Sequence, residues 1–263
     1  MHLRIRLSLL ALIAVAAGVA CDESPVQWGD PVPIDQGTSP TRLVVDSSGH
    51  AVFVASPAPV PSGPTSPGLC VTSLRAAPGA TRIFSAWWNV RRDSSSALLM
   101  ANSADSGRTW NTPVAVDTTD VASTGCNRPP PSVATVGDDL FVAYSMVAPE
   151  GKGVFFAHSM GAMVHSPVAV IYGDRLVPTA ISAEGDDVAV AYEDPNGTRQ
   201  QVGVAFSIAQ GHIFAWHATA SRSVDNATLP AVALAGRELA VSWAARRSSD
   251  SSAVRVVRVG RIH

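Results

Sequence analysis

The chain has 263 residues, of which 46% are hydrophobic and 15% charged, enough for one large all-β domain or two small ones. This apolar content supports a sizeable buried core and excludes a disordered chain. The formal net charge of -2 leaves no surplus of positive charge for phosphates, which argues against a nucleic acid as partner.

The first twenty residues predict an export signal. Arg4 and Arg6 precede an apolar run over residues 7–17, and small residues lead from this run to Cys21. The run is too short to cross a bilayer comfortably as a permanent helix. We therefore expect residues 1–20 to act as a signal peptide.

The residues next to this cysteine carry a second signal. Gly18-Val19-Ala20-Cys21 resembles a bacterial lipobox, in which the cysteine is lipidated and becomes the first residue of the mature chain. Gly18 departs from the usual Leu, so ordinary signal cleavage is the alternative. The resemblance implies lipidation at Cys21, a short tether over residues 21–25, and an exported lipoprotein anchored to a membrane, either in the periplasm or at the cell surface.

Residues 26–263 are typical of one all-β domain built from short strands. Three segments repeat one pattern, in which a Pro opens a strand and a second, apolar strand follows. Pro131, Pro178 and Pro230 are 47 and 52 residues apart, a period typical of propeller blades. The second strands of these repeats end in a small residue followed by an aromatic residue, and so does the corresponding strand over residues 82–87: Ala86-Trp87, Ala143-Tyr144, Ala191-Tyr192 and Ser242-Trp243.

The two ends of this domain complement each other. Trp28 and Pro31 have the same spacing as Trp110 and Pro113, so the N-terminal segment resembles the outermost strand of a blade. Residues 229–259 supply three strands and no fourth. We therefore expect the N-terminal strand to complete the last blade, which leaves no open sheet edge.

Five strand pairs begin near residues 41, 70, 131, 178 and 230, so the sequence predicts a β-propeller of about five four-stranded blades. The first blade is degraded. Its two strands are followed by the Pro-rich residues 57–67, which cannot form a normal strand ladder. That segment is either a long surface loop or the site of lost strands.

A tight turn at residues 103–110 has the pattern Ser-x-Asp-x-Gly-x-Thr-Trp. Ser and Asp side chains can accept hydrogen bonds from local backbone amides, and Gly supplies a positive φ. This turn resembles the Asp-box (the bacterial neuraminidase repeat), which lies between the third and fourth strands of blades in sialidase-like β-propellers. In that family the box lies away from the catalytic face. The resemblance therefore implies a structural role for Ser103, Asp105, Gly107, Thr109 and Trp110.

The resemblance also implies where a ligand would bind, because sialidase-like propellers build their site from the starts of first strands and from loops after second strands. Arg128 and Arg175 each lie three residues before a repeated Pro, and are expected to clamp one anion. Aromatic and acidic residues complete a groove suited to a carboxylated or sugar-like ligand: Trp87, Tyr144, Tyr192, Glu193 and Trp243. The alternative is that the aromatics pack between blades and the arginines form a solvated rim.

Active sialidases share an aromatic-Arg-Ile-Pro motif and a Tyr–Glu nucleophile pair. That motif is absent here, and the side chains of Tyr192 and Glu193 should diverge because they are neighbours in a strand. We therefore expect a non-catalytic envelope lipoprotein that binds a glycan or an envelope protein. A divergent sialidase or other glycoside hydrolase, and an architectural subunit of an envelope assembly, are the alternatives.

The sequence predicts no cofactor, because it has no phosphate-binding loop and no Gly-x-Ser-x-Gly, His-Glu-x-x-His or Cys-x-x-Cys motif. The histidines are scattered and predict no metal site. Cys70 and Cys126 both precede strands at the start of consecutive blades, and export favours a disulfide between them. Two buried free thiols are the alternative.

Overall fold

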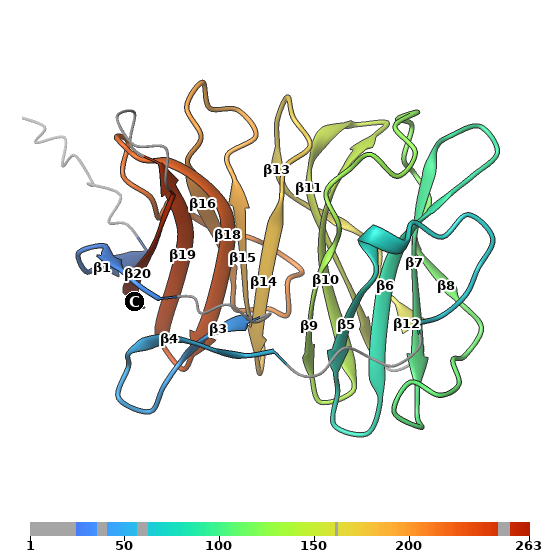
Figure 1. Cartoon of the computed structure of the whole chain (residues 1–263), viewed down its shortest axis with the longest axis horizontal. Helices are drawn as coiled ribbons and strands as arrows, with labels where there is room; N and C mark the ends of the chain where they lie inside the picture. Colours follow the sequence, from blue (N-terminus) through green and yellow to red (C-terminus); the bar gives the residue numbers. More distant parts are fainter. Residues whose placement is uncertain (1–24, 36–40, 57–62, 161–162, 247–252) are drawn as a thin grey trace, which may run out of the picture.

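The computed structural model describes residues 25–35, 41–56, 63–160, 163–246 and 253–263 (Figure 1). The predicted signal peptide, the lipidation site at Cys21 and most of the tether lie outside the described residues. Within the described ranges, no helix is long and apolar enough to cross a membrane.

The described residues are all-β apart from one short 3-10 helix, and form five antiparallel sheets arranged as propeller blades. Blade 1 has two strands within the described ranges, which agrees with the predicted degraded blade. Its strands are β3 (Thr41–Val45) and β4 (Ala51–Ala55). Blade 2 contains β5 (Arg75–Pro78), β6 (Ile83–Val90), β7 (Ser96–Ser103) and β8 (Val114–Asp117), and is preceded by the 3-10 helix η1 (Val71–Ser73).

Blades 3 and 4 follow in the same order. Blade 3 contains β9 (Ser132–Val136), β10 (Asp139–Ala148), β11 (Gly151–Met160), β12 (Met163–Val164) and β13 (Val168–Tyr172). Its outermost position is divided between β12 and β13, which both pair with β11. Blade 4 contains β14 (Thr179–Glu184), β15 (Asp187–Glu193), β16 (Val202–Ser207) and β17 (Trp216–Thr219).

Blade 5 unites the two ends of the chain. It contains β18 (Asn226–Ala235), β19 (Glu238–Arg246) and β20 (Val254–Ile262), and its outer strand is made by β1 (Val26–Trp28) and β2 (Val32–Pro33). Val26 pairs with Ile262, and Trp28 pairs with Gly260. A Cβ on Gly260 would lie 2.4 Å from Cγ1 of Val26, so only glycine permits this close approach. The predicted pairing of the N-terminal strand with the last blade is confirmed.

Neighbouring blades pack through their first strands, in the order β3, β18, β14, β9 and β5. Figure 1 shows the four larger blades standing side by side along the long axis of the molecule. The connections between strands lie on two opposite faces of the domain, which we call the loop face and the turn face. The loop face carries the connections after second strands and before first strands. The turn face carries the connections between first and second strands and between third and fourth strands.

The second strands of blades 3 and 4 are buried on both sides, because each of these blades lies between two others. In β10, Leu140, Val142 and Tyr144 pack against blade 2, while Phe141 and Ala143 pack against blade 4. Alternate residues of a strand point to opposite faces of its sheet, so an unbroken apolar run fills two interfaces at once. The blade interfaces are thus the hydrophobic core.

The turn at residues 103–110 is held by its own side chains. The Ser103 hydroxyl accepts a hydrogen bond from the backbone N–H of Gly107 at 2.8 Å, and Asp105 accepts from the backbone N–H and the hydroxyl of Thr109 at 2.8 and 2.7 Å. Gly107 has a φ of 84°. The bonds from Thr109, with one from Ser103, lower the pKa of Asp105 to about 2.

The turn at residues 207–214 has the same backbone design with fewer side-chain bonds. The Ser207 hydroxyl accepts from the N–H of Gly211 at 3.1 Å, and Gly211 has a φ of 81°. The residue before each glycine, Ser106 or Gln210, also has a positive φ. Ala209 occupies the position of Asp105, so the Asp–Thr bonds are missing here; the Ser207 hydroxyl accepts from Ala209 as well, and Gln210 bonds to Asp186.

We expect loss of β1 to destabilise blade 5. Two chains that differ only in residues 25–36, one starting at Pro25 and the other at Gly37, provide the comparison. Burial of Val26 alone is worth about 1.5–3 kcal/mol, so the shorter chain should lose at least that much free energy of unfolding. Urea denaturation measures the difference. Equal unfolding midpoints would show that β1 is a dispensable tail.

Candidate functional site

Three of the predicted groove residues lie in the core. The side chains of Trp87, Tyr144 and Trp243 are fully buried, each with a relative exposure of 0%. The Tyr144 hydroxyl donates to Asp117 at 2.6 Å; burial raises the pKa of Tyr144 well above its usual value, and the Asp117 carboxylate adds to this effect. The prediction that these aromatics line an open groove is therefore corrected, because blade packing covers them.

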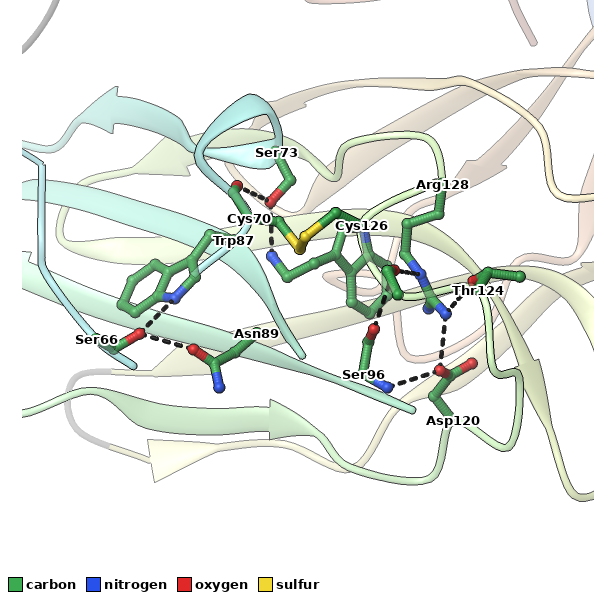
Figure 2. Close-up of a disulfide and its surroundings, with 12 residues drawn as sticks. Ser66, Cys70, Ser73, Trp87, Asn89, Ser96, Asp120, Thr124, Cys126 and Arg128 are labelled. Carbon is green, nitrogen blue, oxygen red and sulfur yellow. Dashed lines mark hydrogen bonds and ion pairs between the residues drawn. A yellow bond between two sulfur atoms is a disulfide. The ribbon is translucent and has the colours of Figure 1, made fainter. Parts of the chain in front are cut away.

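Arg128 is also a buried structural residue. Its guanidinium lies 2.8 Å from the carboxylate of Asp120, and both side chains are almost completely buried (Figure 2). It also donates to the Thr124 hydroxyl and to the Gly125 carbonyl, and it lies 4.7 Å from the centre of the Trp88 ring. The buried carboxylate replaces the anionic ligand that the sequence predicts for Arg128.

The predicted disulfide between Cys70 and Cys126 is present, with its two Cα atoms 5.4 Å apart. It joins the segment before blade 2 to the segment before blade 3 (Figure 2). The bond closes a loop with a sequence separation of 56 residues. Cross-links of this span restrict the unfolded chain, and this one also fixes the segment that carries Arg128.

Arg175 lies on the loop face and is exposed, but its guanidinium is engaged by backbone. It donates to the carbonyls of Asp194 at 2.6 Å and Gly197 at 3.2 Å. These bonds shape the loop between β15 and β16. The predicted clamp of Arg128 and Arg175 around one anion is therefore corrected, because the first arginine is paired internally and the second organises a loop.

Tyr192 and Glu193 diverge, as their neighbouring positions in β15 predict. The Glu193 carboxylate accepts a hydrogen bond from the backbone N–H of Leu229, in blade 5, at 2.9 Å. Burial raises the pKa of Glu193, against the opposing effects of that N–H and of Arg175. Tyr192 packs instead toward blade 3. The two side chains thus belong to different blade interfaces.

A pocket of about 240 Å³ lies beside Tyr192, between blades 3 and 4. Its lining residues come from β13, from the ends of β15, β16 and β17, and from the loop between β15 and β16: Ile171, Tyr192, Asp194, Gln201, Gly203, His217, Ala218 and Thr219. A Cβ on Gly203 would lie 2.8 Å from the Tyr192 ring, so the glycine makes room for the phenol. His217 bridges the blades through a contact of 2.9 Å between its Nε2 and the Val170 carbonyl oxygen.

The Tyr192 hydroxyl has no hydrogen-bond partner among the described residues. Burial raises the pKa of Tyr192, and the Asp194 carboxylate adds to this effect, so the phenol stays protonated at neutral pH. Tyr192 lines the pocket, and its hydroxyl is not among the buried polar atoms without a partner. The phenol O–H is therefore available to a molecule in the pocket.

A wider, shallower depression of about 480 Å³ lies at the loop face, and the loop after β15 lines both depressions through Asp194 and Asn196. It is lined by Glu150, Gly151, Lys152, Tyr172, Gly173, Asp174 and Asn196. Tyr172 is 49% exposed and packs edge-on against Phe155, on the face of β13 opposite to Ile171 of the first pocket. The Asn196 side-chain amide donates to the Tyr172 carbonyl at 2.7 Å. We call the two depressions together the loop-face site.

Sequence reasoning found one residue that lines this site, Tyr192, and missed its neighbours. His217, Gln201 and Tyr172 lie in third and fourth strands or just before them, where the repeat pattern is weak. The only sequence pattern that could have indicated these residues is the alignment of the blades, which places the ends of β13 and β17 at the loop face. It does not specify which of their side chains enters the gap between blades.

No family model matches the chain, and no curated protein is significantly similar to it. Among solved structures, a protein of unknown function from Dyadobacter fermentans has a TM-score of 0.52 and 16% identity over 72% of this chain and 52% of its own. Trypanosoma rangeli sialidase has a TM-score of 0.48 and 12% identity, covering 82% of this chain and 39% of its own. The xylan β-1,4-xylosidase from Bacillus halodurans has a TM-score of 0.43 and 12% identity, covering 90% and 52%.

The chain thus spans about half or less of the length of these structures. The Dyadobacter match supports the fold alone, at an identity too low to carry an activity.

We expect Arg128 and Arg175 to differ sharply when each is replaced by Met. Arg128→Met leaves the Asp120 carboxylate buried without its cation, which should lower the free energy of unfolding by about 3–5 kcal/mol. Arg175→Met, the matched exposed control, should change it by less than about 1 kcal/mol. Urea denaturation with the disulfide intact measures both. Similar losses for the two variants would contradict the assignment of Arg128 to the core.

Proposed function

We propose that the protein binds a neutral glycan at the loop-face site without hydrolysing it. The observation that carries this proposal is the unpartnered hydroxyl of Tyr192 in the first pocket, beside a second depression that holds the half-exposed ring of Tyr172; Asp194 and Asn196, from one loop, line the first and the second. Sugar rings present apolar C–H faces and several hydroxyls. An exposed aromatic ring and a set of fixed polar groups match these two features.

The polar groups of the site suit hydroxyl ligands. Asp194 and Asp174 supply carboxylate acceptors, Asn196 and Gln201 supply amides, and the Tyr192 hydroxyl can donate. Several of these groups are already positioned by backbone bonds; Asp194 accepts from the N–H of Asn196 at 2.9 Å. Preorganised groups bind a ligand with a smaller loss of conformational entropy.

The charge of the site favours a neutral sugar over a carboxylated one. Glu150, Asp174 and Asp194 line it, against one lysine, Lys152, whose ammonium donates to the Asp174 carbonyl at 2.8 Å. A sugar carboxylate would meet like charges there. Of the two arginines that would have favoured an acidic sugar, Arg128 is paired with Asp120, and the N–H groups of Arg175 are directed at the carbonyls of Asp194 and Gly197.

The non-catalytic part of the proposal is supported by the positions of Tyr192 and Glu193. A Tyr–Glu nucleophile pair needs the carboxylate within hydrogen-bond reach of the phenol. Glu193 instead holds the Leu229 backbone in the neighbouring blade interface. A divergent glycoside hydrolase therefore has less support than a binding protein.

Titration of neutral xylo-, gluco- and galacto-oligosaccharides, with sialyllactose as the acidic probe, tests this function. We expect one of the neutral series to bind and Tyr172→Ala to weaken it by about tenfold or more, since loss of a ligand-contacting aromatic removes about 1.4 kcal/mol or more. Ile208→Ala, an exposed change on the turn face, is the control and should leave binding unchanged.

Binding of sialyllactose alone would contradict the neutral-glycan proposal. Release of shorter sugars from any bound oligosaccharide, lost in Tyr192→Phe, would show a hydrolase.

We further propose that the protein is exported and anchored through a lipid on Cys21, where it would present the loop-face site at a membrane. The support is the arginine-flanked apolar run that ends at this cysteine. Labelled fatty acid should enter the chain in a bacterial host, and Cys21→Ser should abolish both labelling and membrane association. Efficient membrane association of the Cys21→Ser variant would contradict the anchor.

A further inference from the structure

The hairpin of β11 and β12 gathers four metal-binding side chains on one face. Met160 pairs with Met163 across the hairpin, and Ser159 pairs with Val164. One residue pair further from the hairpin turn, His158 lies opposite His165. The backbone N–H of His165 donates to the His158 carbonyl at 2.9 Å. Alternate residues of a strand share a face, as do residues directly opposite each other in the ladder. His158, Met160, Met163 and His165 therefore lie on the same face.

A third histidine reaches this face from blade 4. His212 lies in the turn between β16 and β17, where its N–H donates to the Ala209 carbonyl at 2.9 Å. Its ring centre is 4.8 Å from that of His158 and 5.7 Å from that of His165, edge-on to both. The rings of His158 and His165 are stacked at 4.5 Å.

Two of these imidazoles each have a ring nitrogen without a hydrogen-bond partner. The Nε2 atoms of His158 and His165 are buried and make no hydrogen bond to any described residue, and His158 is 4% exposed. Phe141 and Phe156 stack on His158 from within blade 3. A buried ring nitrogen without a partner, next to an apolar wall, is unfavourable unless a ligand binds it.

We infer that the described residues form a binding site for one cuprous ion on the turn face, with the thioethers of Met160 and Met163 and one or two of the imidazoles of His158, His165 and His212 as its donors. Thioether sulfur is a soft ligand that selects Cu(I), and imidazole binds copper well. Met160 and Met163 are 38% and 68% exposed, so an ion can reach them from solvent. The site is independent of the proposed glycan site, which lies on the opposite face.

Coordination requires a small rearrangement of the rings. Among the described residues, no three His, Cys, Asp or Glu side chains are arranged to hold a metal ion as they stand. The stacked planes of His158 and His165 are parallel, so their nitrogen lone pairs do not converge. Rotation of His165 or His212 about its side-chain torsions is sufficient, and the Cβ–Cγ torsion of histidine is broad. The two methionines complete a set that histidines alone do not form.

Competition with bicinchoninate under anaerobic, ascorbate-reducing conditions tests this site. The protein is the mature chain from residue 21 without a histidine tag, with Cys21→Ser so that no free thiol competes; Cys70 and Cys126 are joined. We expect one Cu(I) per chain. The double variant Met160→Leu/Met163→Leu keeps the size of exposed side chains and should lose at least the 10–100-fold in affinity that follows when a supporting residue of a metal site is removed.

His165→Gln/His212→Gln should cause a similar loss, while His50→Gln, in an exposed turn of blade 1, should cause none. X-ray absorption of the copper complex should show sulfur neighbours that disappear in the methionine variant. No stoichiometric Cu(I) binding, or binding unchanged in Met160→Leu/Met163→Leu with circular dichroism equal to that of the parent chain, would overturn the site.

Discussion

Burial of each inner blade on both of its faces is the constraint from which the rest of this structure follows. The second strands β10 and β15 are almost completely buried, so residues that alternate along them must all be apolar or internally paired. Polar groups admitted to such interfaces need partners, as the hydrogen bond from the Tyr144 hydroxyl to Asp117 and the pairing of the Arg128 charge with Asp120 show. A ligand site can form only where this packing opens, at the outer strands and the ends of the blades.

The features that could be predicted from the sequence are those that depend on local pattern. Prolines at blade-length spacing and apolar strands that end in an aromatic residue identify the blades. The Trp–Pro spacing shared by residues 28–31 and 110–113 identifies the strand that completes blade 5, now seen paired with β20. The disulfide followed from the equivalent positions of Cys70 and Cys126 before consecutive blades. In each case one repeat supplied a template for another.

The features that could not be predicted depend on which way a side chain points between blades. Arg128 and Arg175 are equivalent in the repeat, yet one finds Asp120 and the other finds the carbonyls of the β15–β16 loop. A blade pattern defines backbone position and says nothing about the partner across an interface. The cluster of histidines could not be predicted for the same reason. His158 and His212 are far apart in the chain, and only the packing of blade 4 on blade 3 brings their rings together.

The two Ser–Gly turns explain how the turn face could diverge while the fold persisted. Ser207 and Gly211 reproduce the backbone bond and the positive φ of Ser103 and Gly107, although Ala209 and Ile213 replace Asp105 and Thr109. The aromatic residue of the second turn, Phe214, packs edge-on against Phe156 with ring centres 5.2 Å apart, which anchors the turn to blade 3. The Ser–Gly bond and this aromatic contact hold the backbone, so the turn does not depend on the side chain of the residue between Gly211 and Ile213. His212 occupies that position and is thereby presented to the histidines of the neighbouring hairpin.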